Sequence, residues 1–153
     1  MQHPQEFYNN QKAIFEEKTT ALKKKLAISS SLRFITFLGI IFGIYLFFGN
    51  VTAMIIVAVI GLVLFVYLVL KHSDLQYKSN LNRTLIAINK TELDVLNRQY
   101  LNLDDGSEFL NPKHAYSYDI DLFGKGSFFQ YCNRTVTLEG KSELFSELTA
   151  NTI

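Results

Sequence analysis

Residues 34–70 read FITFLGIIFGIYLFFGNVTAMIIVAVIGLVLFVYLVL, and this stretch decides the fold of the chain. It contains no Asp, Glu, Lys, Arg or His. Its second apolar run, Val51 to Leu70, is 20 residues long; as a helix it measures about 30 Å, the thickness of the hydrocarbon core of a bilayer. The first run reaches a similar length when it is extended back to Ala27, because Arg33 can direct its guanidinium toward the membrane interface.

Both runs are expected to be helices, since every backbone N–H and C=O in hydrocarbon must find a partner within its own segment. Only Gly49 and Asn50 separate them, and these residue types favour a tight turn. The sequence therefore predicts a transmembrane helical hairpin over residues 34–70. The competing interpretation is a buried helical pair in a soluble core, but helices of that kind normally keep one charged face, which neither run has.

The charged residues are distributed unevenly around this hairpin, although the net charge is only +1. Residues 1–33 carry six basic and three acidic side chains, residues 71–100 carry five and three, and residues 101–153 carry four and eight. A basic excess on both sides of the apolar stretch fits anionic lipid headgroups and, by the positive-inside rule, places both termini in the cytoplasm. It is weaker than the basic patch expected of a nucleic-acid-binding surface. The single cysteine, Cys132, cannot form an internal disulfide, which agrees with a reducing compartment.

Heptad patterns flank the apolar stretch and predict an amphipathic helix in residues 1–33 and a returning stalk helix in residues 71–100. The predicted seams comprise Phe7/Tyr8, Ile14/Phe15, Ala21/Leu22, Leu26 and Ile28 in the first helix, and Leu81, Leu85, Ile88 and Val95 in the second, with Glu92 and Gln99 as polar members.

Because a hairpin returns the chain to the same side of the membrane, the two seams are expected to pair as an antiparallel coiled-coil stalk. Replacing Ile88 by Asp should then destabilise the stalk far more than the same change at Asn89. The alternative is two separate amphipathic helices that lie on the membrane surface.

Residues 101–153 lack the heptad pattern of the preceding stretches. Their sequence predicts a small mixed connector of turns, one extended segment and two short helices. Asp104-Asp105-Gly106 and Asn111-Pro112 are turn signals. Residues 116–122 alternate apolar and polar side chains, as a half-buried strand or extended segment does. Two short helices are expected after it. The first covers 128–133 and is capped by Ser127 with Gln130, and the second begins near Thr137 and buries Leu144, Phe145 and Leu148.

The sequence contains no arrangement that predicts catalysis or a bound cofactor. Gly124-Lys125-Gly126-Ser127 lacks the preceding glycine and the lysine-hydroxyl order of a phosphate-binding loop. The acidic residues do not have the spacing of a calcium loop, and the histidines have no partners at metal-ligand spacing. The residues considered for these sites are Asp104, Asp105, Glu108, Asp119, Asp121, His72 and His114.

The segments 118–124, 127–130 and 133–137, with Gly140 and Leu144 after them, resemble the start of the core or lever domain of MutS-family mismatch-repair ATPases. The whole layout is similar to a bacterial subgroup of membrane-anchored MutS-like proteins, although Tyr131-Cys132 replaces the family's usual aliphatic residues. In the family these motif residues have a structural task, the positioning of the first core helix. Carried onto this chain, they are Gly124, Ser127, Asn133, Arg134, Thr135, Thr137 and Gly140.

The resemblance implies that residues 101–153 begin an incomplete core domain, truncated before the DNA clamp and the ATPase domain. It implies a full-length parent that binds ATP with Mg²⁺ and DNA, forms a homodimer, and resides in the bacterial inner membrane. This chain alone would then be a membrane anchor without enzymatic activity. The alternative is a self-contained membrane scaffold that recruits a partner through its stalk and its acidic tail.

Overall fold

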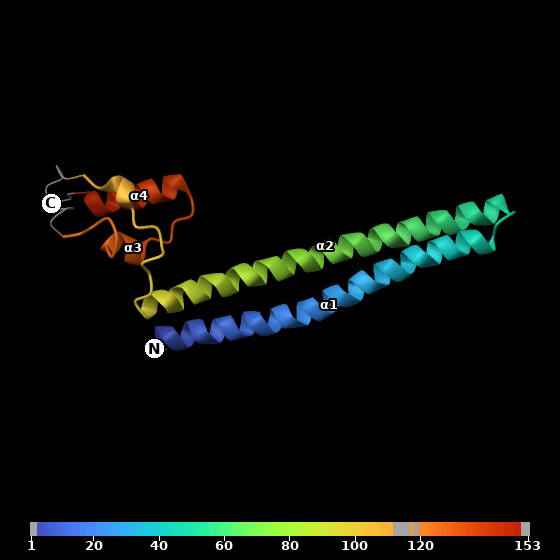
Figure 1. The fold of residues 1–153 in the computed structure, drawn as a ribbon, viewed down its shortest axis with the longest axis horizontal. Coiled ribbons are helices and arrows are strands. Elements are labelled where there is room, and N and C mark those ends of the chain that lie inside the picture. Colours follow the sequence, from blue (N-terminus) through green and yellow to red (C-terminus); the bar gives the residue numbers. More distant parts are fainter. Residues whose placement is uncertain (1–2, 112–116, 118–119, 151–153) are drawn as a thin grey trace. The chain divides into compact units, whose positions relative to one another are not determined.

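The computed structural model describes residues 3–111, 117 and 120–150 and divides the chain into two compact units, Met1–Lys90 and Thr91–Ile153. We call them the hairpin unit and the C-terminal unit. The fold is mainly α, as predicted, and the described residues form no β-strand. The elements are the helices α1 (Pro4–Leu46) and α2 (Val51–Leu96), the short 3-10 helix η1 (Ser107–Phe109), and the helices α3 (Phe128–Cys132) and α4 (Leu138–Thr149), as Figure 1 shows.

A tight turn at the predicted Gly49-Asn50 position connects α1 to α2. Gly49 adopts φ +103°, a conformation that only glycine takes readily. The side-chain Oδ1 of Asn50 accepts a hydrogen bond from the backbone N–H of Ala53 at 3.2 Å, which satisfies one of the free donors at the start of α2. The turn thus ends one helix and caps the next.

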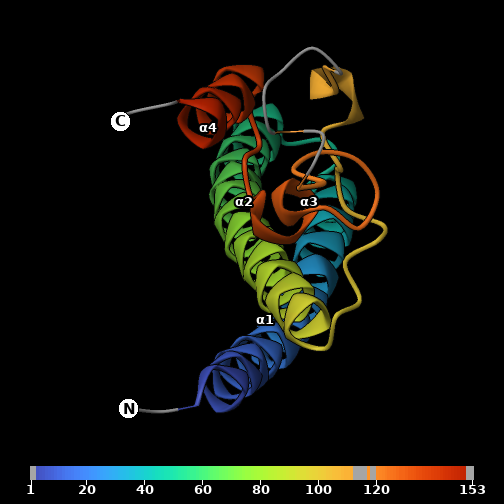
Figure 2. The same cartoon turned by 90° about the vertical axis from the view of Figure 1, so that its left-hand side faces the viewer.

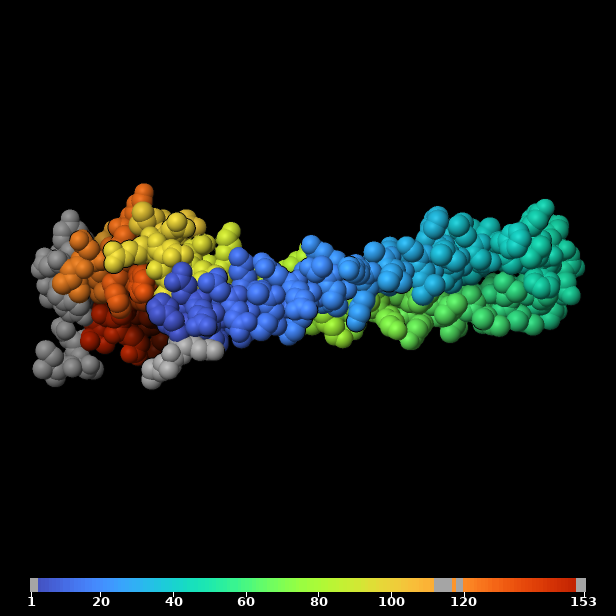
Figure 3. Space-filling view, turned by 90° about the horizontal axis from the view of Figure 1, so that it is seen from below, coloured from blue at the N-terminus to red at the C-terminus, as the bar shows by residue number. Residues whose placement is uncertain are grey.

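The two long helices lie side by side along their length (Figures 1 and 3). In the view along the hairpin, α1 lies to the left of α2 at the near end and to the right of it at the far end (Figure 2), so the helices wind around each other. One antiparallel register accounts for three contacts between them. These contacts join Ser29 to His72, Ile40 to Gly61, and Gly43 to Val57.

A single heptad seam runs through the whole hairpin unit. On each helix, the side chains that are less exposed than their neighbours recur at alternating steps of four and three residues, the spacing of a coiled coil. On α1 they are Tyr8, Lys12, Phe15, Thr19, Leu22, Leu26, Ser29, Arg33, Thr36, Ile40 and Gly43. On α2 they are Met54, Ala58, Gly61, Phe65, Leu68, His72, Leu75, Ser79, Asn82, Ile86 and Asn89.

The paired stalk predicted from the sequence is therefore present, but its predicted seam on α2 is wrong by one position at Leu81 and Ile88. Val95 is buried, as predicted, and Leu85 and Glu92 are half-buried. Leu81 and Ile88 remain 48% and 52% exposed, whereas Ser79 is 0% exposed and Asn89 is buried. On α1 the prediction is right for Tyr8, Phe15, Leu22 and Leu26, and Ile14 beside them is half-buried. It is wrong for Phe7, Ala21 and Ile28, which are exposed. Because Asn89 is the seam residue, we now expect Asn89→Asp to destabilise the stalk more than Ile88→Asp, the reverse of the order predicted from the sequence.

The continuity of α2 explains the shift. Phe65 and Leu68 fix the phase of the seam in the apolar half, and a helix without an inserted stutter keeps that phase into the stalk. The stalk seam must then accept Ser79, Asn82 and Asn89. The more apolar stripe through Leu81 and Ile88 is left on the flank of the hairpin.

The C-terminal unit is built around a small aromatic core. Leu122, Phe123 and Phe129 are buried at its centre. Phe109 from η1 and Phe145 from α4 stack with ring centroids 4.5 Å apart and both contact the ring of Phe123. Leu144 and Leu148 of α4 pack against the same core, as predicted for this helix. Loops, short helices and one amphipathic helix thus share one set of apolar contacts.

The extended segment predicted for residues 116–122 is not observed in its described part. Tyr116, Tyr118 and Asp119 lie outside the described residues. The chain turns at 120 and 121: Asp121 has φ +47°, and the N–H of Leu122 donates to the carbonyl of Ser117 at 3.0 Å. This turn leaves Ile120 60% exposed and buries Ser117, so the apolar-polar alternation does not translate into two faces of a strand.

The two short helices begin where the sequence predicts. The Ser127 hydroxyl accepts a hydrogen bond from the N–H of Gln130 at the start of α3, and the Thr137 hydroxyl accepts one from the N–H of Gly140 at the start of α4. These contacts satisfy backbone donors that have no partner inside the helix. The caps fix where each helix starts and therefore which side chains reach the aromatic core.

Candidate functional site

Both long helices are long and apolar enough to cross a membrane, judged by length and composition. Most large apolar side chains between Phe34 and Leu70 point away from the partner helix; Phe34 and Val63, for example, are well exposed. A contiguous apolar surface of this size is unfavourable in water. The apolar half of the hairpin is therefore the first candidate functional region.

Small residues let the two helices approach closely in this half. A Cβ atom added at Gly43 would lie 2.9 Å from Cγ1 of Val57, and one added at Gly61 would collide with the side chain of Ile40. At Gly39, in contrast, no atom lies within 4 Å of such a Cβ. Gly43 and Gly61 therefore have a packing role that is common among membrane helices.

Polar seam residues gather where the apolar stretch meets the stalk. His72 Nδ1 and Ser29 Oγ are 3.3 Å apart, at hydrogen-bonding distance. One turn farther along α1, Arg33 has its Nε atom buried with no hydrogen-bond partner among the described residues. In the stalk the hydroxyls of Thr19 and Ser79 are also buried without such a partner. The polar groups in this part of the seam therefore add little to the stability of the helix pair. Their heptad positions place them between the helices.

Two neighbouring grooves lie on one flank of the hairpin, and together we call them the lysine groove. The part nearer the apolar stretch has a volume of about 390 Å³ and the other part about 370 Å³. Lys25 lines both parts. The further lining residues are Ile28, Ser29, Leu32, Leu68, Lys71 and Leu75 in the first, and Lys18, Ala21, Leu22, Lys78, Leu81 and Asn82 in the second.

In the C-terminal unit the residues for which a structural task was expected from the sequence resemblance lie in turns, caps and links. The N–H of Gly124 donates to the carbonyl of Asp105 at 2.8 Å. Asn133 Oδ1 accepts from both the N–H and the hydroxyl of Thr135. Arg134 forms a two-pronged ion pair with Glu92, with Nε–Oε1 at 2.6 Å and an outer nitrogen at 3.3 Å from Oε2. With the caps that Ser127, Thr137 and Gly140 form, these contacts set the position of α3 and α4.

Gln130 is a link that the sequence analysis identified only as a capping residue. Its side chain is buried, and its Nε2 donates to the carbonyl of Leu103 at 2.6 Å while its Oε1 accepts from the N–H of Gly126 at 2.7 Å. Both polar ends of the amide are thus satisfied. The residue fastens the loop after α2 to the start of α3.

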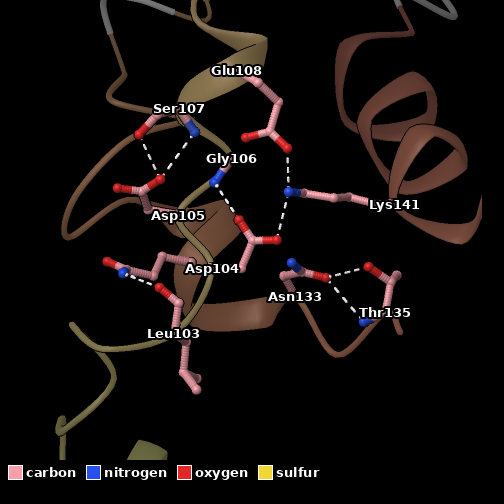
Figure 4. Close-up of polar contacts among 10 residues, drawn as sticks. Leu103, Asp104, Asp105, Gly106, Ser107, Glu108, Asn133, Thr135 and Lys141 are labelled. Carbon is pink, nitrogen blue, oxygen red and sulfur yellow. Dashed lines mark hydrogen bonds and ion pairs between the residues drawn. The ribbon is translucent and has the colours of Figure 1, made fainter. Parts of the chain in front are cut away.

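Lys141 of α4 contacts two acidic residues, Asp104 in the loop after α2 and Glu108 in η1 (Figure 4). Its Nζ lies 2.5 Å from Asp104 Oδ2 and also contacts Glu108. The hydrogen bond from Lys141 lowers the pKa of Asp104, and the same hydrogen bond raises the pKa of Lys141. Hydrogen bonds from Ser107 lower the pKa of Asp105. Three of the acidic residues considered as metal ligands, Asp104, Asp105 and Glu108, are thus engaged by a lysine or by turn contacts.

No other site chemistry is evident in the described part of the chain. Residues 3–111, 117 and 120–150 contain no cluster of three or more His, Cys, Asp or Glu that could hold a metal ion. Cys132 is a free thiol whose pKa is raised by burial, which makes it a poor nucleophile at neutral pH. His114 and Asp119 lie outside the described residues.

Comparison of the chain with protein-family models, with curated proteins and with solved structures finds no match. The candidate regions therefore rest on geometry: the apolar hairpin, the lysine groove and the linked turns of the C-terminal unit. The lysine groove was missed from the sequence, although a helical projection in the correct heptad phase places Lys18, Lys25, Lys71 and Lys78 at equivalent flanking positions.

Proposed function

We propose that this chain is a membrane anchor: residues 34–70 cross the bilayer as a helical hairpin, and the paired stalk carries the C-terminal unit on the cytoplasmic side. The observation that carries the proposal is the outward-facing apolar surface of a hairpin with no charged residue over 37 consecutive positions, Phe34 to Leu70. Support for the orientation comes from the basic excess on both flanks and the uncharged turn.

Membrane insertion is tested by extracting membranes from expressing cells with alkaline carbonate, which releases peripheral proteins. The full chain is expected in the pellet and released only by detergent. Recovery in the carbonate supernatant would contradict a spanning hairpin and would favour surface-bound amphipathic helices.

The orientation is tested with single cysteines in a Cys132→Ser background. Asn50 lies in the turn and Thr84 is exposed in the stalk, whereas Ser79 is unsuitable because it is buried. An impermeant thiol reagent applied to intact bacterial cells should label Asn50→Cys, and Thr84→Cys only after permeabilisation. The opposite pattern would place the termini outside.

We further propose that the anchor belongs to a MutS-like DNA-binding ATPase of the bacterial inner membrane. Support comes from the sequence resemblance and from the structural tasks of its motif residues: Ser127 and Thr137 cap helices, and Asn133 holds the link between them. ATP, Mg²⁺, DNA and dimer contacts would belong to the parent protein. The test is the reading frame beyond Ile153, which should encode a Gly-x-x-x-x-Gly-Lys-Ser/Thr motif.

A self-contained scaffold is the second candidate, and the aromatic core of the C-terminal unit favours it. A unit that buries Phe123 and Phe129 among its own residues can present a surface to a partner without further chain. A reading frame without the ATPase motif, together with a stable C-terminal unit in the intact protein, would support the scaffold over the ATPase anchor.

A further inference from the structure

We propose that the lysine groove is a binding site for the headgroup of an anionic phospholipid. The inference rests on the proposed membrane anchor and goes beyond it, because it assigns a defined lipid site to one flank of the hairpin. It starts from the composition of the part that lies nearest the apolar stretch. There, Lys25 and Lys71 stand on different helices beside a floor of Ile28, Leu32, Leu68 and Leu75.

The lysines of this groove have few acidic partners in the protein, although the ammonium groups of Lys18 and Lys71 lie over the rings of Phe15 and Tyr67. Among the described residues, no acidic side chain is within ion-pair distance of Lys18, Lys25 or Lys71. Lys78 is the exception, because it pairs with Asp74 at 2.7 Å. Arg33, directly before the charge-free stretch, is a further cation without an acidic partner among the described residues, although it does not line the groove. Several cations beside one concave surface favour an anionic ligand.

The position of the groove distinguishes a lipid from a soluble anion. Lys71 directly follows Leu70, the last residue of the charge-free stretch, and Lys25 lies just before the point where the first apolar run begins at Ala27. Lysines at this level have their ammonium groups among the headgroups. Ile28 and Leu32 of the apolar floor are exposed, so they can contact acyl chains. Basic pockets between membrane helices bind anionic headgroups in this way.

The same stretch of α1 supplies a matched control. Lys23 and Lys24 are exposed and do not line the lysine groove. The pair Lys25→Gln/Lys71→Gln and the pair Lys23→Gln/Lys24→Gln remove the same charge from the same region of the chain. A general attraction of the basic flank to anionic membranes would be weakened equally by both pairs. A defined site would be weakened by the first pair only.

The experiment measures binding of dioleoyl phosphatidylglycerol and dioleoyl phosphatidylcholine to the full chain in detergent by native mass spectrometry. The unmodified chain should prefer phosphatidylglycerol, and Lys25→Gln/Lys71→Gln should weaken that binding about thirtyfold, from roughly 1 kcal/mol per lysine. Lys23→Gln/Lys24→Gln should stay within about threefold of the unmodified chain. Equal effects of the two pairs, or no preference for phosphatidylglycerol, would overturn the lipid site.

Inorganic phosphate serves as the competing ligand. A site that needs the apolar floor should retain phosphatidylglycerol when phosphate is present in large excess, whereas full displacement by phosphate would show a simple anion site and overturn the lipid assignment. Carbonate extraction of the same variants separates the two proposals. If Lys25→Gln/Lys71→Gln stays in the membrane pellet while losing lipid binding, the site and the anchor are both supported; a chain released by carbonate contradicts the anchor itself.

Discussion

The hairpin unit and the C-terminal unit are stabilised in opposite ways. The hairpin repeats one weak contact pattern over many heptads, accepts polar residues in its seam, and directs most of its apolar side chains outward. The C-terminal unit concentrates its apolar contacts on a few buried aromatic rings and holds its loops with specific hydrogen bonds. We therefore expect a long seam to tolerate the loss of a single contact better than a small core does.

The largest effect is therefore expected at the centre of the C-terminal unit. Phe129 is 0% exposed and contacts the rings of Phe109 and Phe123. Phe129→Ala should destabilise this unit by about 3–5 kcal/mol, the usual result of leaving a cavity in place of a buried ring. Hydrogen exchange in the intact, detergent-solubilised chain should show lost protection in α3 and α4, with α1 unchanged.

The neighbouring residue provides the control for this change. Phe128 is 55% exposed, so Phe128→Ala removes an aromatic side chain of the same size from the same helix without opening a cavity. Its effect should be smaller than about 1 kcal/mol. Equal loss of protection in the two variants would show that the core of this unit is not packed as the structure describes.

In the hairpin unit, the largest loss of stability is expected where a larger side chain is added at a close contact between the helices. Gly61→Leu places a side chain against Ile40 and should cost about 1–3 kcal/mol, as overpacking does, whereas Gly39→Leu meets open space. The measurement is the yield of cross-linking between Ser29→Cys and His72→Cys, whose native side chains are in contact, in a Cys132→Ser background. A similar yield in both leucine variants would contradict the close approach at Gly61.

The two units also differ in how much of them the sequence predicts. The helices of the apolar stretch, the turn at Gly49, the cap at Ser127 and the helix start near Thr137 depend on local chemistry and were predicted correctly. The predicted seam of the stalk was displaced by one residue at Leu81 and Ile88. The phase of the seam there is inherited from Phe65 and Leu68 in the apolar half and is not set by the most apolar stripe.

The candidate sites also differ in whether they depend on neighbouring residues or on residues far apart in the sequence. The capping roles of Ser127 and Thr137 can be read from residue types at fixed spacing. The lysine groove cannot, since Lys25 and Lys71 come together only through the antiparallel register of the hairpin. The pairing of Lys141 with Asp104 also joins residues far apart in the chain, and no local pattern indicates it.

A smaller and opposite effect is expected in the polar part of the stalk seam. The Ser79 hydroxyl is buried and has no hydrogen-bond partner among the described residues. Ser79→Ala removes that unsatisfied group and should stabilise the stalk by about 1 kcal/mol. Thermal unfolding followed by circular dichroism measures the change. Ser73→Ala, on the exposed side of the same helix, controls for the higher helix propensity of alanine and should raise the melting temperature less.

The smallest effect is a pH dependence of the C-terminal unit. The pKa of Asp104 is lowered from 3.8 by its hydrogen bond with Lys141, so the carboxylate contributes stability above pH 3.8 and loses it as the pH falls through its folded-state pKa. The pKa of Lys141 is raised from 10.5, so its contribution is complete below pH 10.5 and disappears as the pH rises through its folded-state pKa. Because Asp104 is half exposed, the pair should contribute less than about 1 kcal/mol to the stability of the C-terminal unit.

Asp104→Asn should therefore slightly reduce the hydrogen-exchange protection of α4 at neutral pH. Below pH 3.8 the difference in protection between this variant and the unmodified chain should become smaller. Glu143→Gln is the control, because it removes one negative charge from α4 at a position outside this ion pair. It should leave the protection of α4 unchanged both at neutral pH and in acid. A loss of protection in Asp104→Asn that persists undiminished in acid would show that the side chain acts through the turn it forms with Gly106 and not through Lys141.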